Sequence, residues 1–245
     1  MSQLKKLCKE LRISNLEDIL TEVEFEEPKQ YLTDILELAV KQRKNRRVKR
    51  LIKRAGFPTT KTLDNYDFEP ISFPDNIDKK DLLSLEFIDK KENILMLGSV
   101  GTGKTHLATA LGIKACSYDK KVKFYRAADL TNELLEKHKD GQAGKLIAKI
   151  AKTDVLIIDE LGYIPFSKKA SELLFSVISN CYEQQSIIVT SNLEFGRWNE
   201  VFGDDRLTAA LVDRVVHHAY ILAFTGKSYR FQQAMTSRKK GEEKA

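Results

Sequence analysis

The chain has 245 residues, of which 42% are hydrophobic and 31% charged, and its formal net charge is +6. This composition is typical of a globular protein with a substantial core, and the mild positive charge favours an anionic partner. No apolar run approaches the ~18 residues that cross a bilayer and the first residues carry no signal-peptide pattern, so we expect a cytoplasmic protein with no membrane partner. The three widely spaced cysteines fit a reducing compartment, and they form neither a disulfide framework nor a metal-site spacing.

Residues 1–57 are predicted to form a small helical domain. Leucines recur at helical intervals through residues 1–24, where Ser14 and Glu17 have the spacing of a capping box. Pro28 is a typical first residue of a helix, and an amphipathic spacing continues from Tyr31 until Gly56 ends it. We therefore expect two short helices followed by one long helix.

The second half of this long helix is strongly basic. Nine of the fourteen residues from 41 to 54 are Lys or Arg, and none is acidic. Cations along a helix can follow the phosphates of nucleic acid, which gives affinity without reading the base sequence. A solvated helix face is the open alternative. We predict binding to duplex DNA, with little sequence preference, through Lys41, Arg43, Lys44, Arg46, Arg47, Lys49, Arg50, Lys53 and Arg54.

Beyond residue 57 the pattern changes. Residues 58–80 contain three prolines and are predicted to be a linker. Through residues 81–231, short apolar segments alternate with helical ones such as 170–184, which predicts an α/β fold whose parallel sheet is covered by helices on both faces. Residues 232–245 are expected to form a flexible tail. The candidate strands are Ile94–Leu97, Val122–Tyr125, Val155–Ile158, Ile187–Thr190 and Tyr220–Phe224.

The first of these strands leads directly into a phosphate-binding pattern. The pattern G-x-x-x-x-G-K-[ST] stands between a strand and a helix, which is the context that this motif requires. Glycines let successive N–H groups point inward, and the helix N-terminus adds positive charge. Lys104 can reach the β- and γ-phosphates, and the Thr105 hydroxyl can bind Mg²⁺. We predict a nucleotide site formed by Gly98, Ser99, Val100, Gly101, Thr102, Gly103, Lys104, Thr105 and His106.

A second strand ends in two carboxylates, Asp159 and Glu160. Asp159 is placed to hold Mg²⁺, and Glu160 to polarise a water for attack on the γ-phosphate. The alternative is a strand that merely ends in solvated carboxylates, but the upstream phosphate loop argues against it. An acidic pair at this place favours hydrolysis over storage of a nucleotide. No guanine-reading segment is visible, so ATP is the expected nucleotide.

Other polar positions are candidates for the same reaction. Asn192 follows a predicted strand and could hydrogen-bond the attacking water, with an ordinary turn residue as the alternative. Arg214 precedes the last strand, where it could act only on the nucleotide of a neighbouring subunit. A surface ion pair with Asp213 or another nearby acid is the alternative for Arg214, and Arg206 is the second candidate for the same role.

Two adjacent histidines, His217 and His218, come just before the last predicted strand. They have no sequence partner at the spacing of a metal site or a catalytic triad. We interpret both as surface or packing residues.

Together these segments resemble the AAA+ ATPases of the initiator and helicase-loader clade, in particular the IstB-like family of transposition helpers, with DnaC-type helicase loaders next. The likeness rests on GSVGTGKTHLATALG, VLIIDELGYIP and VTSNLEFGRWNEVFGDDRLTAALVDRVVHHAYIL, and it extends from about residue 30 to residue 231. It implies that residues 98–105 are the Walker A loop and that Asp159 and Glu160 are the Walker B pair. It also implies that Asn192 is the residue named sensor 1 and that Arg214 is an arginine finger.

The resemblance further implies ATP-dependent homo-oligomers on DNA that direct a partner transposase. The 21 residues after Phe224 are too few for the helical lid of general AAA+ proteins, a truncation shared with IstB-like and DnaC-like proteins. Arg230 is a candidate substitute for the arginine of that lid. In this clade, the insertion after the second predicted strand carries a helix that faces the central pore, which makes Lys139 and Lys145 candidate DNA contacts.

Three functions are consistent with these observations. The first is an ATPase that assembles on DNA and activates a transposase, in the bacterial cytosol and associated with the nucleoid. The second is a replicative helicase loader, which the preference for duplex or single-stranded DNA would separate from the first. The third is an ATP-gated DNA scaffold with little hydrolysis, against which the Asp159–Glu160 pair argues.

Overall fold

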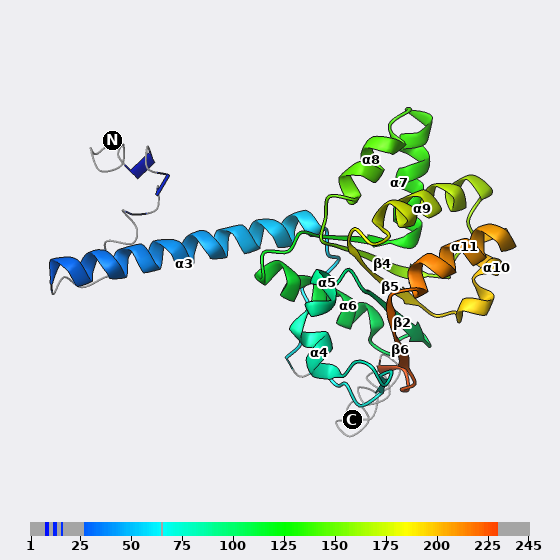
Figure 1. Cartoon of the computed structure of the whole chain (residues 1–245), viewed down its shortest axis with the longest axis horizontal. Coiled ribbons are helices and arrows are strands. Elements are labelled where there is room, and N and C mark those ends of the chain that lie inside the picture. Colours follow the sequence, from blue (N-terminus) through cyan, green and yellow to red (C-terminus); the bar gives the residue numbers. More distant parts are fainter. Residues whose placement is uncertain (1–7, 10–11, 14–15, 17–26, 65, 230–245) are drawn as a thin grey trace, which may run out of the picture. The chain divides into compact units, whose positions relative to one another are not determined.

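The computed structural model describes residues 8–9, 12–13, 16, 27–64 and 66–229 (Figure 1). The chain divides into two compact units, Met1–Arg50 and Leu51–Ala245. The predicted capping box at Ser14, the residue Arg230 and the predicted tail lie outside the described residues. Within the described ranges, no helix combines the length and the apolar character needed to cross a membrane.

The long predicted helix is present as α3, Pro28–Ala55 (Figure 1). Proline is tolerated in the first turn because its missing N–H would be unpaired there. Ile35 and Ala39, which lie four residues apart, are buried on one face of the helix. The helix ends at Gly56, whose φ of +81° is the left-handed conformation that commonly terminates helices.

A six-stranded sheet forms the centre of the second unit, with the strand order β1-β6-β2-β5-β4-β3. Five strands are parallel, and β1 pairs antiparallel with β6 at one edge. The five predicted strands are all present and are longer than predicted by one to three residues. Their bounds are β2 Asn93–Gly98, β3 Val122–Arg126, β4 Val155–Leu161, β5 Ser186–Ser191 and β6 Ala219–Phe224, and the additional strand is β1 Ile71–Ser72.

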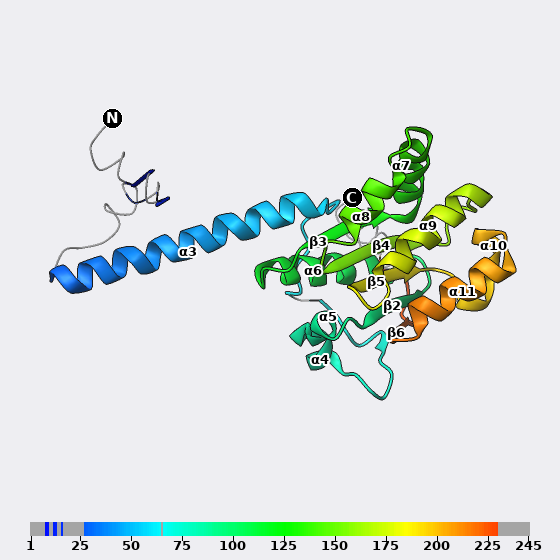
Figure 2. The ribbon, with the colours of Figure 1, turned by 45° about the horizontal axis from the view of Figure 1, so that its top comes forward.

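Helices cover both faces of this sheet, as the near-continuous apolar strands predict (Figures 1 and 2). Alternate residues of β4 enter two separate cores, with Leu156 and Ile158 in one and Val155 and Ile157 in the other. One core is covered by α7 Ala127–Lys139, α8 Ala143–Ile150, α9 Lys168–Cys181, α10 Asn199–Phe202 and α11 Asp205–Val216, with the short 3-10 turn η1 Phe195–Arg197 before α10. The other is covered by α4 Lys79–Ser84, α5 Glu86–Asp89 and α6 Lys104–Ser117.

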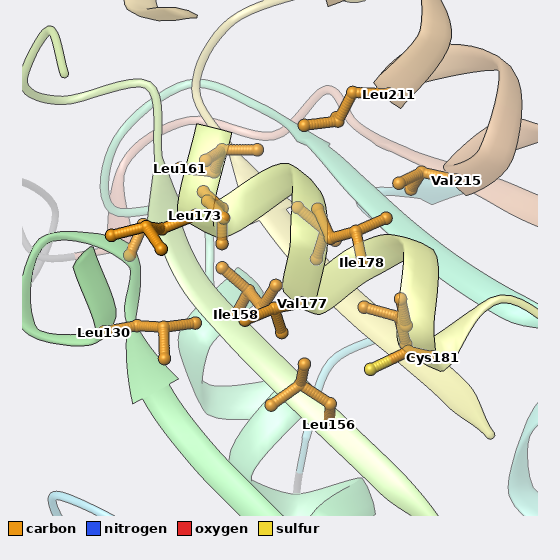
Figure 3. Close-up of a cluster of buried hydrophobic side chains, with 14 of the residues drawn as sticks. Leu130, Leu156, Ile158, Leu161, Leu173, Val177, Ile178, Cys181, Leu211 and Val215 are labelled. Atoms are coloured by element: carbon orange, nitrogen blue, oxygen red, sulfur yellow. The ribbon is translucent and has the colours of Figure 1, made fainter. Parts of the chain in front are cut away.

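The helix α9 illustrates how the larger core is filled. Its apolar residues Leu173, Val177, Ile178 and Cys181 recur at helical spacing and are buried. Figure 3 shows them directed toward Leu156 and Ile158 of β4 and toward Leu211 and Val215 of α11. This packing fixes the ends of β4 and α11, and both elements carry predicted site residues.

The segment 58–80, predicted as a linker, packs into the second unit. Ile71 and Ile77 are buried in the core beneath α6, and Tyr66 and Phe68 pack against the same core. Ile71 also pairs with Phe224 through β1. Prolines at the edge of a sheet are compatible with such pairing because no ladder N–H is needed on the open side. The difference from the prediction arises because apolar residues recur between the prolines.

Candidate nucleotide-binding site

The predicted phosphate loop joins the end of β2 to the start of α6, in the expected strand–loop–helix order. Gly98, Gly101 and Gly103 have φ values of +144°, +82° and +98°, which side chains disfavour. A Cβ at Gly98 would lie 2.3 Å from the carbonyl oxygen of Phe224 on the neighbouring strand. Glycine is therefore required both for the turn and for the close packing of β2 against β6.

Lys104, the first residue of α6, points back into this loop. Its side chain is buried, and Nζ donates hydrogen bonds to the carbonyl oxygens of Gly98 at 2.6 Å and Ser99 at 2.7 Å. These bonds hold the ammonium group inside the loop, where the phosphates of a nucleotide would lie. The helix N-terminus adds partial positive charge at the same place.

Asp159 on β4 is the centre of a small buried network. Its Oδ1 accepts hydrogen bonds from the hydroxyls of Thr105 at 2.9 Å and Thr190 at 2.6 Å. Its Oδ2 is buried and has no hydrogen-bond partner in the described part of the chain. A buried carboxylate oxygen without a partner is costly, and a divalent cation would satisfy it. Thr105 and Asp159 are therefore a fitting pair of oxygen ligands for Mg²⁺.

Glu160 follows with an uncommon backbone conformation, φ +60°. Its N–H donates to the Thr190 hydroxyl at 3.0 Å, and β4 has an irregular register with β5 at this point. The side chain is partly exposed, and its Oε2 lies 3.6 Å from Nε of Arg126. Such strain occurs at functional sites, where it redirects a side chain. Here it brings the Glu160 carboxylate beside a cation at the end of β3.

Thr190 and Arg126 were not predicted as site residues. They lie near the carboxyl ends of the two strands that flank β4, and Arg126 stands in register with Asp159. The carboxyl ends of the strands are the usual ligand positions in parallel sheets. The signal that could have found them is the neighbour order of the strands, which requires the topology.

Asn192 follows β5 at the same edge of the sheet. Its Oδ1 is buried and has no hydrogen-bond partner among the described residues. A Cβ placed at Gly162, just after β4, would lie 3.0 Å from this oxygen. The amide is therefore beside the segment that follows Glu160. Its contact with an attacking water stays a prediction.

Thr62 and Tyr66 contact the phosphate loop and the start of α6 from one side. The Tyr66 hydroxyl donates to the carbonyl oxygen of Gly103 at 3.2 Å, and its ring lies 5.0 Å from that of His106. Burial, with a smaller effect of Asp67, raises the pKa of Tyr66, so this hydroxyl stays protonated as a donor. Nε2 of His106 lies 2.9 Å from the Thr62 carbonyl oxygen. The His106 side chain therefore contacts Thr62, which the sequence did not predict.

The segment after β6 contacts the loop as well. The Tyr229 N–H donates to the carbonyl oxygen of Gly101 at 2.9 Å. A Cβ at Gly101 would lie 2.3 Å from Oγ of Ser228. Residues 228–229 therefore pack directly on the phosphate loop.

The two candidate arginines lie at opposite ends of α11. Arg214 is half-buried, with its guanidinium 4.8 Å above the Phe175 ring and Nη1 donating to the Ala210 carbonyl oxygen at 2.9 Å. Among the described contacts Arg214 forms no ion pair with Asp213 or with another acid, which was its alternative interpretation. Arg206 lies in the first turn and is exposed. Action on a neighbouring subunit stays a prediction for both.

The predicted DNA contacts are all exposed. This holds for the nine basic residues of α3, and for Lys139 at the end of α7 and Lys145 in α8. His217 and His218 are exposed, as their interpretation as surface residues predicts, but their contacts were not predicted. The Tyr182 hydroxyl lies 2.8 Å from Nδ1 of His217, and Glu183 lies 3.7 Å from Nε2 of His218.

Comparison with known proteins places this geometry in a family. The chain matches the IstB-like ATP-binding proteins over residues 3–237. It is 40% identical to an insertion sequence IS5376 putative ATP-binding protein of Geobacillus stearothermophilus, over 83% of this chain and 81% of the relative. It is 34% identical to an insertion sequence IS21 putative ATP-binding protein of Pseudomonas aeruginosa, over 95% of this chain and 90% of the relative.

Among solved structures, the DnaC helicase loader has a similar fold. It superimposes with a TM-score of 0.51 and 21% sequence identity, covering 66% of this chain and 96% of the loader. This likeness shows that the second unit has the AAA+ fold. The glycine loop with Lys104, the network around Asp159 and the match across nearly the whole sequence agree, and the chain belongs to the family of IstB-like ATP-binding proteins.

Proposed function

We propose that this chain is an ATP-hydrolysing helper of insertion-sequence transposition that oligomerises on duplex DNA and assists a partner transposase in the bacterial cytosol, at the nucleoid. The observation that carries hydrolysis is the convergence of Lys104, Thr105, Asp159 and Glu160 at one edge of the sheet. The transposase partner is supported by the relatives, which are named as insertion-sequence proteins.

The site residues have different roles in phosphoryl transfer. Lys104 and the N–H groups of the loop bind the phosphates, and Thr105 and Asp159 would hold Mg²⁺. When bound, Mg²⁺ neutralises the charge that develops on the phosphate oxygens. Glu160 orients a water and accepts a proton from it. Because Thr190 bonds both to Asp159 and to the Glu160 backbone, one hydroxyl positions the metal ligand and the base together.

We propose that a second copy of the chain completes the nucleotide site. An arginine delivered by a neighbouring subunit contributes strongly to phosphoryl transfer, and Arg214 is the residue proposed for it. Its guanidinium is packed on Phe175 and bonded to the helix backbone, so its position is preorganised. ATP binding and assembly are then coupled, because each nucleotide lies between two copies.

Contact with DNA is proposed for the basic residues of α3. On an ideal helix with 100° between residues, seven of the nine cations between residues 41 and 54 fall within an arc of about 160°, while Lys41 and Lys44 fall outside it. A stripe of this kind can follow a phosphate backbone over several turns. The residues of the arc are Arg43, Arg46, Arg47, Lys49, Arg50, Lys53 and Arg54.

Glu160→Gln tests this proposal. Without its base, the protein should bind ATP and stay assembled on duplex DNA while hydrolysis is lost. Electron microscopy and an ATPase assay, each with and without DNA, measure both properties. Rapid disassembly of this variant, or a wild-type chain that stays monomeric with ATP, Mg²⁺ and long duplex DNA, would contradict the proposal. A preference for single-stranded DNA would instead favour a helicase loader.

A further inference from the structure

A cluster of side chains that could bind a metal lies near the amino ends of the parallel strands, at the opposite end from the nucleotide site. Glu183 comes shortly before the start of β5, and His217 and His218 come just before the start of β6. The nucleotide residues, in contrast, lie at the carboxyl ends of the parallel strands. Each of the three side chains offers one ligand atom, and these atoms all lie within 4.8 Å of one another.

Two imidazoles and one carboxylate are a ligand set typical of zinc. Ligand atoms about 2.0–2.1 Å from a tetrahedral zinc ion are roughly 3.4 Å apart. Nε2 of His218 and Oε1 of Glu183 are already 3.7 Å apart, and both side chains are about half exposed, at 49% and 55%. His217 is exposed as well. Small side-chain rotations, which cost little at a surface, would therefore bring all three within bonding distance of one ion.

Neighbouring groups orient the ligands as a metal site requires. The Tyr182 hydroxyl lies 2.8 Å from Nδ1 of His217. A hydrogen bond at one ring nitrogen fixes the orientation of the imidazole and leaves the other nitrogen for a metal. Glu183 has φ +57°, an uncommon conformation for a residue with a side chain. The backbone N–H groups of Gln184 and Gln185, which follow it, both donate to the Cys181 carbonyl oxygen and hold this turn.

The buried residue Asn93 holds the two halves of the cluster together. Its side chain donates to the Val215 carbonyl oxygen at 3.0 Å and accepts from the Ile187 N–H at 2.8 Å. Its backbone N–H donates to the His218 carbonyl oxygen at 2.6 Å. The end of α11 and the start of β5 are thus tied to one buried residue beneath the cluster. The histidines and Glu183 are carried by a rigid support.

We propose that Glu183, His217 and His218 bind a divalent transition metal, with zinc as the reference ion, which clamps the end of α9 to the junction of α11 and β6. Three protein ligands leave a further coordination position for water. The site is separate from the predicted Mg²⁺ ligands Thr105 and Asp159, and its ligand set differs because imidazole nitrogens favour transition metals.

Cobalt(II) is the spectroscopic probe for this site. The full chain, without a histidine tag and freed of metals with a chelator, is titrated with Co²⁺ and then with Zn²⁺. One equivalent of Co²⁺ should give a visible absorption band of low-coordinate cobalt, and Zn²⁺ should remove it. His217→Ala and His218→Ala should each weaken binding at least tenfold. Tyr182→Phe, which removes only the orienting hydroxyl, should weaken binding by roughly 10–100-fold.

His138→Ala is the matched control, because His138 is an exposed histidine at the end of α7 and lies outside the cluster. This variant should bind Co²⁺ as the wild type does. Zn²⁺ should raise the Tm of the wild type and of His138→Ala, and leave that of the double variant His217→Ala/His218→Ala unchanged. Tm values measured without metal show whether the variants are folded.

Three results would overturn the metal site. The first is the absence of stoichiometric binding to the wild type. The second is binding that persists unchanged in the double histidine variant. The third is a near-ultraviolet band from thiolate-bound cobalt, which would assign the ion to a cysteine. None of these results depends on ATP hydrolysis, so failure here and failure of the proposed function are distinguishable.

Discussion

At the scale of single residues, Thr190 makes two of the contacts that build the reaction site. Its hydroxyl donates to Asp159 and accepts from the backbone of Glu160. We expect Thr190→Val, which keeps the shape and removes the hydroxyl, to lower kcat by roughly 10–100-fold, the usual cost of losing a group that orients a metal ligand. Thr190→Ser restores the hydroxyl and should restore most of the rate. An unchanged rate in Thr190→Val together with a loss in Thr190→Ser would assign the residue to packing alone.

The ion pair between Arg126 and Glu160 leads to a prediction of the opposite sign. A cation beside the carboxylate competes with the water that Glu160 has to orient. Partly exposed ion pairs are worth about 0.2–1 kcal/mol, so Arg126→Gln should raise basal ATP hydrolysis by no more than about fivefold. Arg197→Gln, which breaks a second Arg–Glu pair with Glu200, is the control and should leave the rate unchanged. A loss of activity in Arg126→Gln would instead show that Arg126 contacts the nucleotide.

The same residues show what the sequence could predict about the site. Lys104, Thr105 and Asp159 stand in linear patterns whose spacing is fixed by one loop and one strand, so they were predicted. Arg126 and Thr190 reach the site only because β3 and β5 lie on either side of β4. Glu183 meets His218 from 35 positions away in the chain. Contacts of this kind depend on the strand order and on side-chain directions, and no local pattern carries either.

At the scale of elements, the apolar runs predicted every long strand, because strands that are buried on both faces are almost continuously apolar. The start of α3 was predicted from Pro28, a typical first residue of a helix. The segment 58–80 was predicted to be a linker, and the structure adds that several of its residues pack into the core. Its prolines and polar residues dominate the pattern, while Tyr66, Ile71 and Ile77 anchor it to the core. The packing of these three residues could not be predicted without knowing the core surface that they cover.

The basic half of α3 gives a prediction at this scale. Arg46→Gln/Arg50→Gln removes two charges from the proposed stripe, whereas Lys41→Gln/Lys44→Gln removes two from the same helix outside it. The first variant should weaken duplex binding and reduce the magnitude of the salt slope by about two, one for each lost phosphate contact. The second should change binding little. Equal effects would remove the stripe from the proposal, and no effect in either would leave the helix as a solvated face.

At the scale of the whole molecule, the proposed site is complete only between two copies, which makes complementation the decisive measurement. Lys104→Ala should abolish nucleotide binding and leave Arg214 intact. Arg214→Ala should bind ATP and lose about 10³-fold or more in hydrolysis. Each variant alone should be inactive, but a mixture contains sites in which ATP on the Arg214→Ala copy meets Arg214 of the Lys104→Ala copy. Activity should therefore reappear on mixing.

The same mixing experiment distinguishes the two candidate arginines. Arg206, at the exposed start of α11, is eight residues from Arg214, or about 12 Å along the helix. The two arginines therefore cannot contact the same γ-phosphate in the same way. If Arg206→Ala is the variant that complements Lys104→Ala, the role moves to the start of the helix. If neither mixture regains activity while Arg214→Ala alone remains inactive, Arg214 acts within its own subunit or supports α11 through Phe175. Restored activity would support a nucleotide shared between neighbours, because neither variant alone carries both Lys104 and Arg214.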